Sequence, residues 1–99
     1  MNTQIQAIHF KADKKLIDFI ENKITKLETF HDGIIDAQVF LKLENTQIKE
    51  NKTIEIKINI KQTSFIQTET SLSFEAATDL AIESLKKQIK RYKGKIEDR

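Results

Sequence analysis

The chain has 99 residues, of which 38% are hydrophobic and 32% are charged, and its formal net charge is +2. This length fits one domain over residues 1–99 with a single hydrophobic core. The absence of cysteine excludes disulfides, thiolate nucleophiles and cysteine-ligated metal sites. No apolar run is long enough to cross a bilayer, and the first residues lack a signal-peptide pattern, so we expect a cytoplasmic protein that does not bind membranes.

The first third of the chain predicts a strand followed by a helix. Partial alternation indicates a strand from Thr3 to Phe10, and Asp13 is placed to cap a helix from Lys14 to Phe30. Gly33 then suits the left-handed conformation that often follows a helix end. The helix has one apolar stripe, typical of packing against a core, formed by Leu16, Ile17, Phe19, Ile20, Ile24, Leu27 and Phe30.

Three more strands are predicted in the middle of the chain. Apolar and polar residues alternate from Ile35 to Leu43 and, after a polar loop from Glu44 to Lys52, again from Ile54 to Ile60. The segment from Phe65 to Thr70 is rich in β-branched residues and predicts a fourth strand. The residues expected on the buried face of the first two of these strands are Ile35, Ala37, Val39, Leu41, Leu43, Ile54, Ile56, Ile58 and Ile60.

A long second helix is predicted from Phe74 onward, with Ser73 as its N-cap and Glu75 near the positive end of its dipole. Its apolar seam consists of Phe74, Thr78, Ala81, Ile82, Leu85, Ile89, Tyr92 and Ile96.

The predicted element order β-α-β-β-β-α gives an α+β fold with a four-stranded sheet. Strands that are polar on one side need cover only on the other, so both helices should pack on one face of the sheet. A right-handed crossover through the first helix should place the first two strands side by side and parallel. The fourth strand is a candidate edge strand, through which the protein could self-associate, although we expect the isolated protein to be a monomer.

The sequence contains few groups that could carry catalysis. With only Gly33 and Gly94, the chain cannot build a glycine-rich phosphate loop. His9 and His31 lack a partner at metal-ligand spacing and are interpreted as a strand or surface residue and a helix-end residue. Carboxylates such as Glu55 lie on an exposed sheet face, where a pKa moves little. We therefore expect no enzyme activity, cofactor, metal or small-molecule substrate.

The basic residues are unevenly distributed, because the segment from Ser84 to Arg99 has seven of them against two acidic residues. Lysines near a helix C-terminus stabilise the dipole and keep the surface soluble, which would explain two or three of them. The remaining excess favours an anionic partner, and RNA rather than a membrane because the opposite helix face is in the core. Five basic residues cover the helix side opposite the seam, namely Lys86, Lys87, Lys90, Arg91 and Lys93.

The first helix could extend this basic surface. Lys23 lies within its apolar arc and Lys26 flanks it, so both would lie across a groove if that edge borders the second helix. The alternative is a lysine that packs its methylenes and exposes its ammonium group, which is compatible with binding. For base stacking the only candidate aromatics are Phe40, on the open sheet face, and Phe65. Recognition by shape and charge is therefore expected.

Several segments resemble the ribosome hibernation-promoting factor and ribosome-associated inhibitor family in its short form. They are the run from Asn22 to Glu28, the strand from Ala37 to Glu44, and the segments from Ala76 to Ile82 and from Leu85 to Ile89. The resemblance as a whole extends over nearly the whole chain. The Lys-Leu-Glu end of the first helix and the Leu-Lys-Lys-Gln-Ile run of the second are the most specific parts.

The resemblance implies a fold similar to double-stranded-RNA-binding domains, bound to rRNA in the tRNA and mRNA channel of the small ribosomal subunit. Such binding would block translation initiation and protect idle ribosomes during stress. The basic positions of the family correspond to Lys23, Lys26, Lys87 and Arg91, with Lys86, Lys90 and Lys93 beside them.

Two features depart from the family pattern. The second helix starts with Ser73-Phe74-Glu75 in place of an Asp-Met-Tyr-like segment, and we expect no linker or C-terminal dimerisation domain of the long form after Arg99. We therefore expect that the chain does not join two ribosomes by itself. The alternative function is a protein-interaction module that uses the open sheet face, since the family also includes proteins described as sigma-factor modulators.

Overall fold

The computed structural model describes residues 2–31, 33–44 and 51–97, with the last three of these described by backbone alone. The element order is β-α-β-β-β-α, as predicted. The elements are β1 (Asn2–Ile8), α1 (Lys14–Leu27), β2 (Ile34–Leu43), β3 (Lys52–Ile60), β4 (Ser64–Ser71) and α2 (Phe74–Glu97). Residues 45–50, most of the predicted polar loop, and the side chain of Ile96 lie outside the described part.

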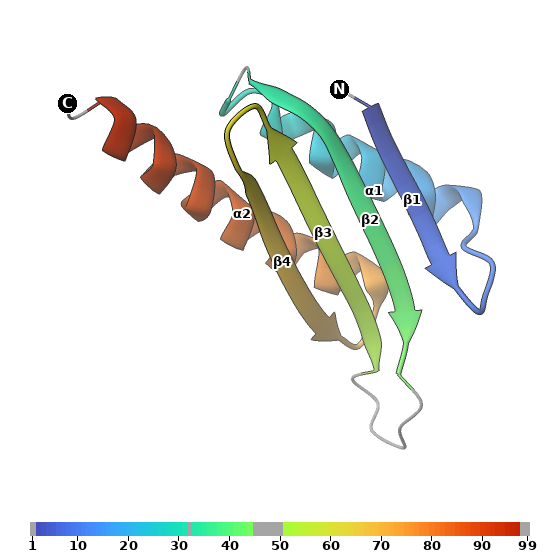
Figure 1. Cartoon of the computed structure of the whole chain (residues 1–99). Coiled ribbons are helices and arrows are strands. Elements are labelled where there is room, and N and C mark those ends of the chain that lie inside the picture. The colour runs from blue at the N-terminus through green and yellow to red at the C-terminus, as the bar shows by residue number, and fades with distance from the viewer. Residues whose placement is uncertain (1, 32, 45–50, 98–99) are drawn as a thin grey trace.

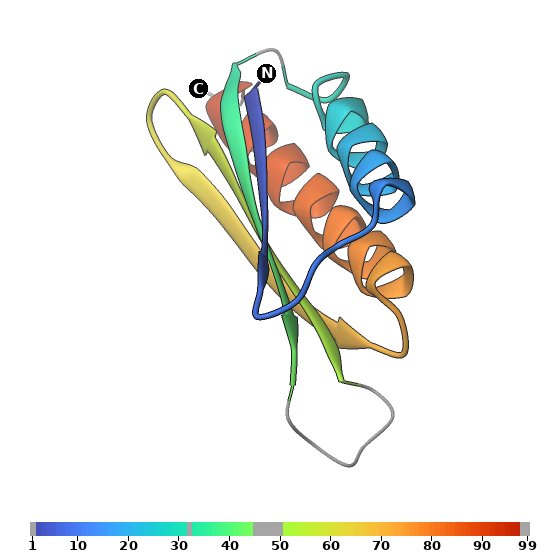
Figure 2. The same ribbon diagram turned by 90° about the vertical axis from the view of Figure 1, so that its right-hand side faces the viewer.

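The four strands form one sheet in the order β1-β2-β3-β4 (Figure 1). β1 is parallel to β2, and the other two neighbouring pairs are antiparallel. The parallel crossover through α1 and the edge position of β4 are therefore both confirmed. Both helices cover the same face of the sheet and leave the other face open (Figure 2).

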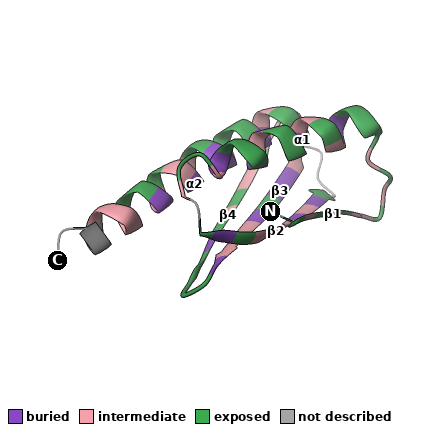
Figure 3. Cartoon of the chain, turned by 90° about the horizontal axis from the view of Figure 1, so that it is seen from above, coloured by how far each residue is buried: buried purple, intermediate pink, exposed green. Residues whose placement is uncertain are grey.

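The buried face of the sheet follows the predicted alternation most closely in β3. Ile54, Ile56 and Ile58 are fully buried, and Ile60 is 7% exposed. The core of α1 consists of Leu16, Ile20, Ile24 and Leu27. The helix faces turned away from the sheet are largely exposed (Figure 3). Packing a single apolar layer between helices and sheet is thus what fixes the position of both helices.

The second helix uses the predicted seam, and both predicted N-caps are present. Asp13 accepts a hydrogen bond from the Leu16 backbone N–H at 2.8 Å, and Ser73 accepts one from Ala76 at 3.0 Å. These bonds satisfy N–H groups that have no partner within the helix. The hydroxyl of the fully buried Thr78 donates to the carbonyl of Phe74 at 2.6 Å, so a polar side chain is tolerated in the seam.

Three predicted boundaries in the first third of the chain are wrong. β1 ends at Ile8 rather than at Phe10, because His9 has a φ of 65° and a left-handed residue cannot continue a strand. α1 ends at Leu27 rather than at Phe30, and the next three N–H groups bond to carbonyls three residues back. Gly33 does not have a positive φ, so it is not a left-handed cap.

A register shift between Ile34 and Asp36 changes the start of β2. Ile34 is 8% exposed, whereas Ile35, which was predicted to be buried, is 56% exposed. A bulge adds one residue to a strand and so reverses the side on which the residues before it lie. Leu43 at the other end of β2, which was also predicted to be buried, is 45% exposed.

Candidate nucleic-acid interface

The two helices pack side by side, so the edge of α1 that carries Lys23 and Lys26 borders α2 (Figure 2). The predicted groove is present, with a volume of about 270 Å³. It is lined by Lys23, Lys26, Asp79, Ile82, Glu83 and Lys86. The groove therefore brings together three of the seven predicted basic residues, but two carboxylates lie among them.

Lys23 is held in place by two partners. Its Nζ lies 3.1 Å from Asp79 Oδ1 on α2 and 5.4 Å from the centre of the Phe19 ring. Its side chain is 33% exposed, so the aliphatic stem packs while the ammonium group reaches the groove. The charge of Lys23 is thus partly offset by a carboxylate before any ligand arrives.

Lys86 is restrained in a similar way from the other side of the groove. Its Nζ lies 3.6 Å from Glu83 Oε1, one turn earlier in α2, and 5.4 Å from the centre of the Phe30 ring. Phe30, which was expected in the core, is 39% exposed and provides an aromatic surface for this lysine instead.

Lys93 joins the end of α1 to α2. Its Nζ donates a 2.8 Å hydrogen bond to the backbone carbonyl of Phe30. A cation at this position neutralises the negative end of the α1 dipole. Lys90 and Lys93 also line a second hollow of about 470 Å³ beside Thr29, Phe30 and Gly94.

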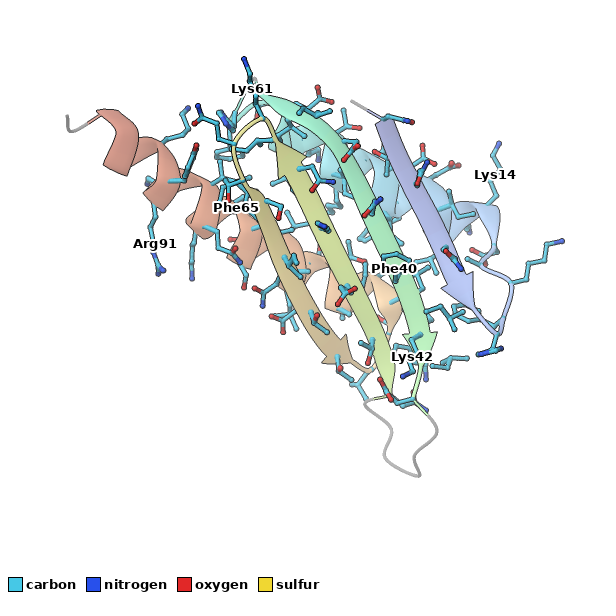
Figure 4. All side chains as sticks on the ribbon, in the orientation of Figure 1. Lys14, Phe40, Lys42, Lys61, Phe65 and Arg91 are labelled. Atoms are coloured by element: carbon cyan, nitrogen blue, oxygen red, sulfur yellow. The ribbon has the colours of Figure 1, made fainter. Side chains whose placement is uncertain are left out.

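The remaining predicted cations are more accessible to a ligand than Lys23, Lys86 and Lys93. Lys26, Lys87, Lys90 and Arg91 are exposed, and within residues 2–31, 33–44 and 51–94 none of them has an ion pair. Arg91 projects from the C-terminal half of α2, beyond the β4 edge of the sheet (Figure 4). Because α2 has no acidic residue from Ser84 to Ile96, the positive potential should be strongest along this half of the helix.

Two acidic residues of α2, Asp79 and Glu83, pair with predicted basic residues. The Glu83–Lys86 pair could have been found, because residues three apart lie together on a helix. The Lys23–Asp79 pair joins two helices that are far apart in sequence, and no pattern within one helix predicts it. The result is two sets of cations: Lys23, Lys86 and Lys93 have partners within the chain, and Lys26, Lys87, Lys90 and Arg91 face water.

The aromatic candidates also differ from the prediction. Phe65 is only 9% exposed, with its ring 5.6 Å from that of Tyr92, so the suggestion that it stacks on bases is wrong. Its position on β4 faces the helices rather than the open side. Phe40 does lie on the open face, half-buried, opposite Glu55 of β3. Asp36, near the start of β2, accepts a 2.6 Å hydrogen bond from the Asn59 side chain of β3.

Among the residues that the structure describes, no three His, Cys, Asp or Glu side chains gather into a possible metal site. Neither α1 nor the described part of α2 is long and apolar enough to cross a membrane.

The fold and this surface define a small α+β module with a cationic helical layer over one face of a four-stranded sheet. The chain belongs to the family described as Sigma 54 modulation protein / S30EA ribosomal protein, whose model matches residues 3–97. The resemblance seen in the sequence is thereby confirmed.

Two named relatives are similar in sequence to nearly the whole of this chain. A ribosome hibernation promotion factor of Bacillus subtilis is 31% identical over 96 residues, which are 97% of this chain and 50% of that protein. A ribosome hibernation promoting factor of Pseudomonas putida is 26% identical over 96% of this chain and 89% of its own length. The chain thus spans half of the first relative and most of the second.

Solved structures share the fold. A ribosomal subunit interface protein from Coxiella burnetii superposes with a TM-score of 0.84 at 17% identity, over 95% of this chain and 99% of that one. The N-terminal domain of Protein Y from Thermus thermophilus gives a TM-score of 0.78 at 26% identity, over 93% and 99% of the two chains. The predicted fold class is therefore confirmed by the element order and by these neighbours.

Proposed function

We propose that this chain is a ribosome hibernation factor: it binds the small ribosomal subunit through rRNA and prevents translation by occupying the tRNA and mRNA channel. The family, and relatives named for ribosome hibernation or for the ribosomal subunit interface, support a ribosomal partner. Binding of this kind is steric and needs no catalysis. It would take place in the cytoplasm, with residues 1–99 acting as one ribosome-binding domain and a monomer.

The observation that carries the proposal is the row of exposed cations on the C-terminal half of α2. Lys87, Lys90 and Arg91 extend over more than one turn and face water. Lys26 on α1 adds a further exposed cation near the groove. Cations spaced along one face of a helix can contact successive phosphates of a folded RNA, and such contacts position a protein without reading sequence.

The proposal gives a different role to the three cations with partners in the chain, Lys23, Lys86 and Lys93. Their ammonium groups already have partners in the chain, so an incoming phosphate must compete with Asp79, Glu83 or the Phe30 carbonyl. Each of these three should therefore contribute less to affinity than an exposed lysine. Their intramolecular contacts hold the two helices in a fixed relation, which presents the exposed cations in one geometry.

Co-sedimentation with purified small subunits over a salt series tests the proposal. We expect the wild type to sediment with the subunits and a Lys87→Glu/Arg91→Glu variant to remain at the top of the gradient. A Lys14→Glu/Lys15→Glu variant is the matched control, because it makes the same change in charge on exposed residues at the opposite end of the helical layer (Figure 4). Failure of the wild type to sediment at low salt would refute the proposal.

The open sheet face supports a second candidate function, that of a protein-interaction module. It has a hollow of about 380 Å³, lined by Ile8, Phe40, Lys42, Glu44, Thr53, Glu55 and Thr68. An aromatic side chain within a polar rim is a feature of protein interfaces. Salt distinguishes the two functions, since a phosphate interface loses affinity with a log–log slope of about −0.7 to −0.9 per contact and a sheet-face protein contact responds much less.

A further inference from the structure

A small hollow lies where the chain after α1, the turn between β3 and β4, and the C-terminal half of α2 meet. Its volume is about 180 Å³, and it is lined by His31, Gly33, Ile60, Lys61, Gln62 and Tyr92. Pockets for drug-sized ligands run from about 300 to 1,000 Å³, so this one has room only for a single small group. Lys61 marks its position at the turn (Figure 4).

Tyr92 is held as one wall of the hollow. Its ring meets the buried Phe65 ring edge-on, with centroids 5.6 Å apart and an interplanar angle of 76°. Its hydroxyl donates a 3.2 Å hydrogen bond to Gln62 Oε1 on the β3–β4 turn. Because Tyr92 is fixed at both the ring and the hydroxyl, little entropy would be lost when a ligand packs against it.

His31 forms a second aromatic wall, 6.2 Å from the Tyr92 ring and tilted by 58°. The ring of His31 lies against Gly33, where an added Cβ would be 3.2 Å from Nε2 and 3.3 Å from Cε1. Contacts that short force a neighbour to move. A larger residue at position 33 would therefore have to push the imidazole away by a few tenths of an ångström.

We propose that this hollow binds one unpaired nucleobase of the RNA, stacked on the face of Tyr92 and contacted at its edge by His31. The inference rests on the proposed function, and it adds a base contact to the phosphate contacts of the helices. Planar aromatic rings are what RNA-binding proteins use to hold splayed-out bases. Lys61, which lines the hollow, is a cation that could contact the adjoining phosphate.

The protein contains one tyrosine and no tryptophan, so its intrinsic fluorescence reports on Tyr92 alone. Titration with a short single-stranded oligoadenylate should quench the Tyr92 fluorescence until it reaches a plateau. A parallel titration of free N-acetyltyrosinamide corrects for the light that the oligoadenylate absorbs. Inorganic polyphosphate is the control, because it has the charge of RNA but no bases, and it should not quench. Equal quenching by both, or none by the oligoadenylate, would overturn the inference.

Substitutions of Tyr92 and His31 test whether this hollow contributes to ribosome binding. Tyr92→Leu should weaken co-sedimentation with small subunits by about 5- to 150-fold, the range typical for loss of one stacked base, whereas Tyr92→Phe should retain binding. The salt slope should not change, since no phosphate contact is lost. His31→Ala, at a position outside the core, should weaken binding and oligoadenylate quenching in the same direction, and circular dichroism checks that each variant is folded.

The outcomes separate the two proposals. If the wild type sediments with the subunits and both Tyr92→Leu and His31→Ala bind equally well, the base-binding site is refuted and the proposed function stands. If the wild type does not sediment at all, the proposed function fails, and the oligoadenylate titration still decides whether the hollow binds bases.

Discussion

Neutralising two exposed cations of α2 should lower the affinity for the small ribosomal subunit by an amount that can be calculated. Lys87 and Arg91 are one turn apart, are exposed, and have no ion pair within the described residues. If each contacts one phosphate, Lys87→Gln/Arg91→Gln should reduce the slope of log affinity against log salt by about 1.4 to 1.8. At about 0.1 M monovalent salt the same two contacts correspond to roughly a 25- to 60-fold loss of affinity.

The assay is binding to purified small subunits at four or more salt concentrations, with the slope as the primary readout. Lys23→Gln/Lys86→Gln is the matched comparison, since it also removes two charges from the helical layer. Because Asp79 and Glu83 lie 3.1 Å and 3.6 Å from these lysines, it should change the slope by less than the exposed pair. An equal or larger effect of Lys23→Gln/Lys86→Gln would contradict the distinction between exposed and internally paired cations.

Three other substitutions test the charges and the packing behind this surface. Asp79→Asn frees Lys23, so ribosome binding should become tighter and more salt-dependent, while urea unfolding should show a loss of stability of at most about 1 kcal/mol, as is usual for exposed ion pairs. Ile24→Ala empties a fully buried position of α1 and should lower the free energy of unfolding in urea by about 2–5 kcal/mol; a loss under 1 kcal/mol would show that α1 does not pack as described. Asp13→Ala removes the N-cap bond to Leu16 and should cost about 1 kcal/mol in thermal unfolding, and Asp13→Asn, which keeps an acceptor, should restore most of it.

The fold could be predicted because the strands alternate clearly and the helices are one-sided. The alternation of Ile54, Ile56 and Ile58 allowed only one buried face, and the structure uses it. Periodic patterns do not predict local irregularities of the backbone. The bulge that exposes Ile35 depends on hydrogen bonding between β2 and β3, and the left-handed backbone of His9 comes from the path that the chain takes into α1. Neither leaves a periodic signal in the sequence.

The candidate surface was predicted in part for a similar reason. The helical wheel identifies which side of α2 faces water, and that was enough to select Lys87, Lys90 and Arg91. It cannot show which residues of α1 lie opposite, so the pairing of Lys23 with Asp79 was missed. Tyr92 was assigned to the apolar seam, which is correct for its contact with Phe65. That it also lies beside His31 follows only from how α1 ends and the chain turns toward β2.

The way in which α2 is anchored has a consequence for its local stability. Among the side chains described in α2, at positions 74–94, Ile89 is the last that is fully buried, and beyond it only Tyr92 packs against the core. Opening of the last turns should therefore cost far less free energy than global unfolding, and their amide hydrogens should exchange rapidly in the free protein. Binding through Lys90, Arg91 and Lys93 would slow that exchange. A hydrogen-exchange footprint would then be expected first at the end of α2, while β2 and β3 stay equally protected with and without the ribosome.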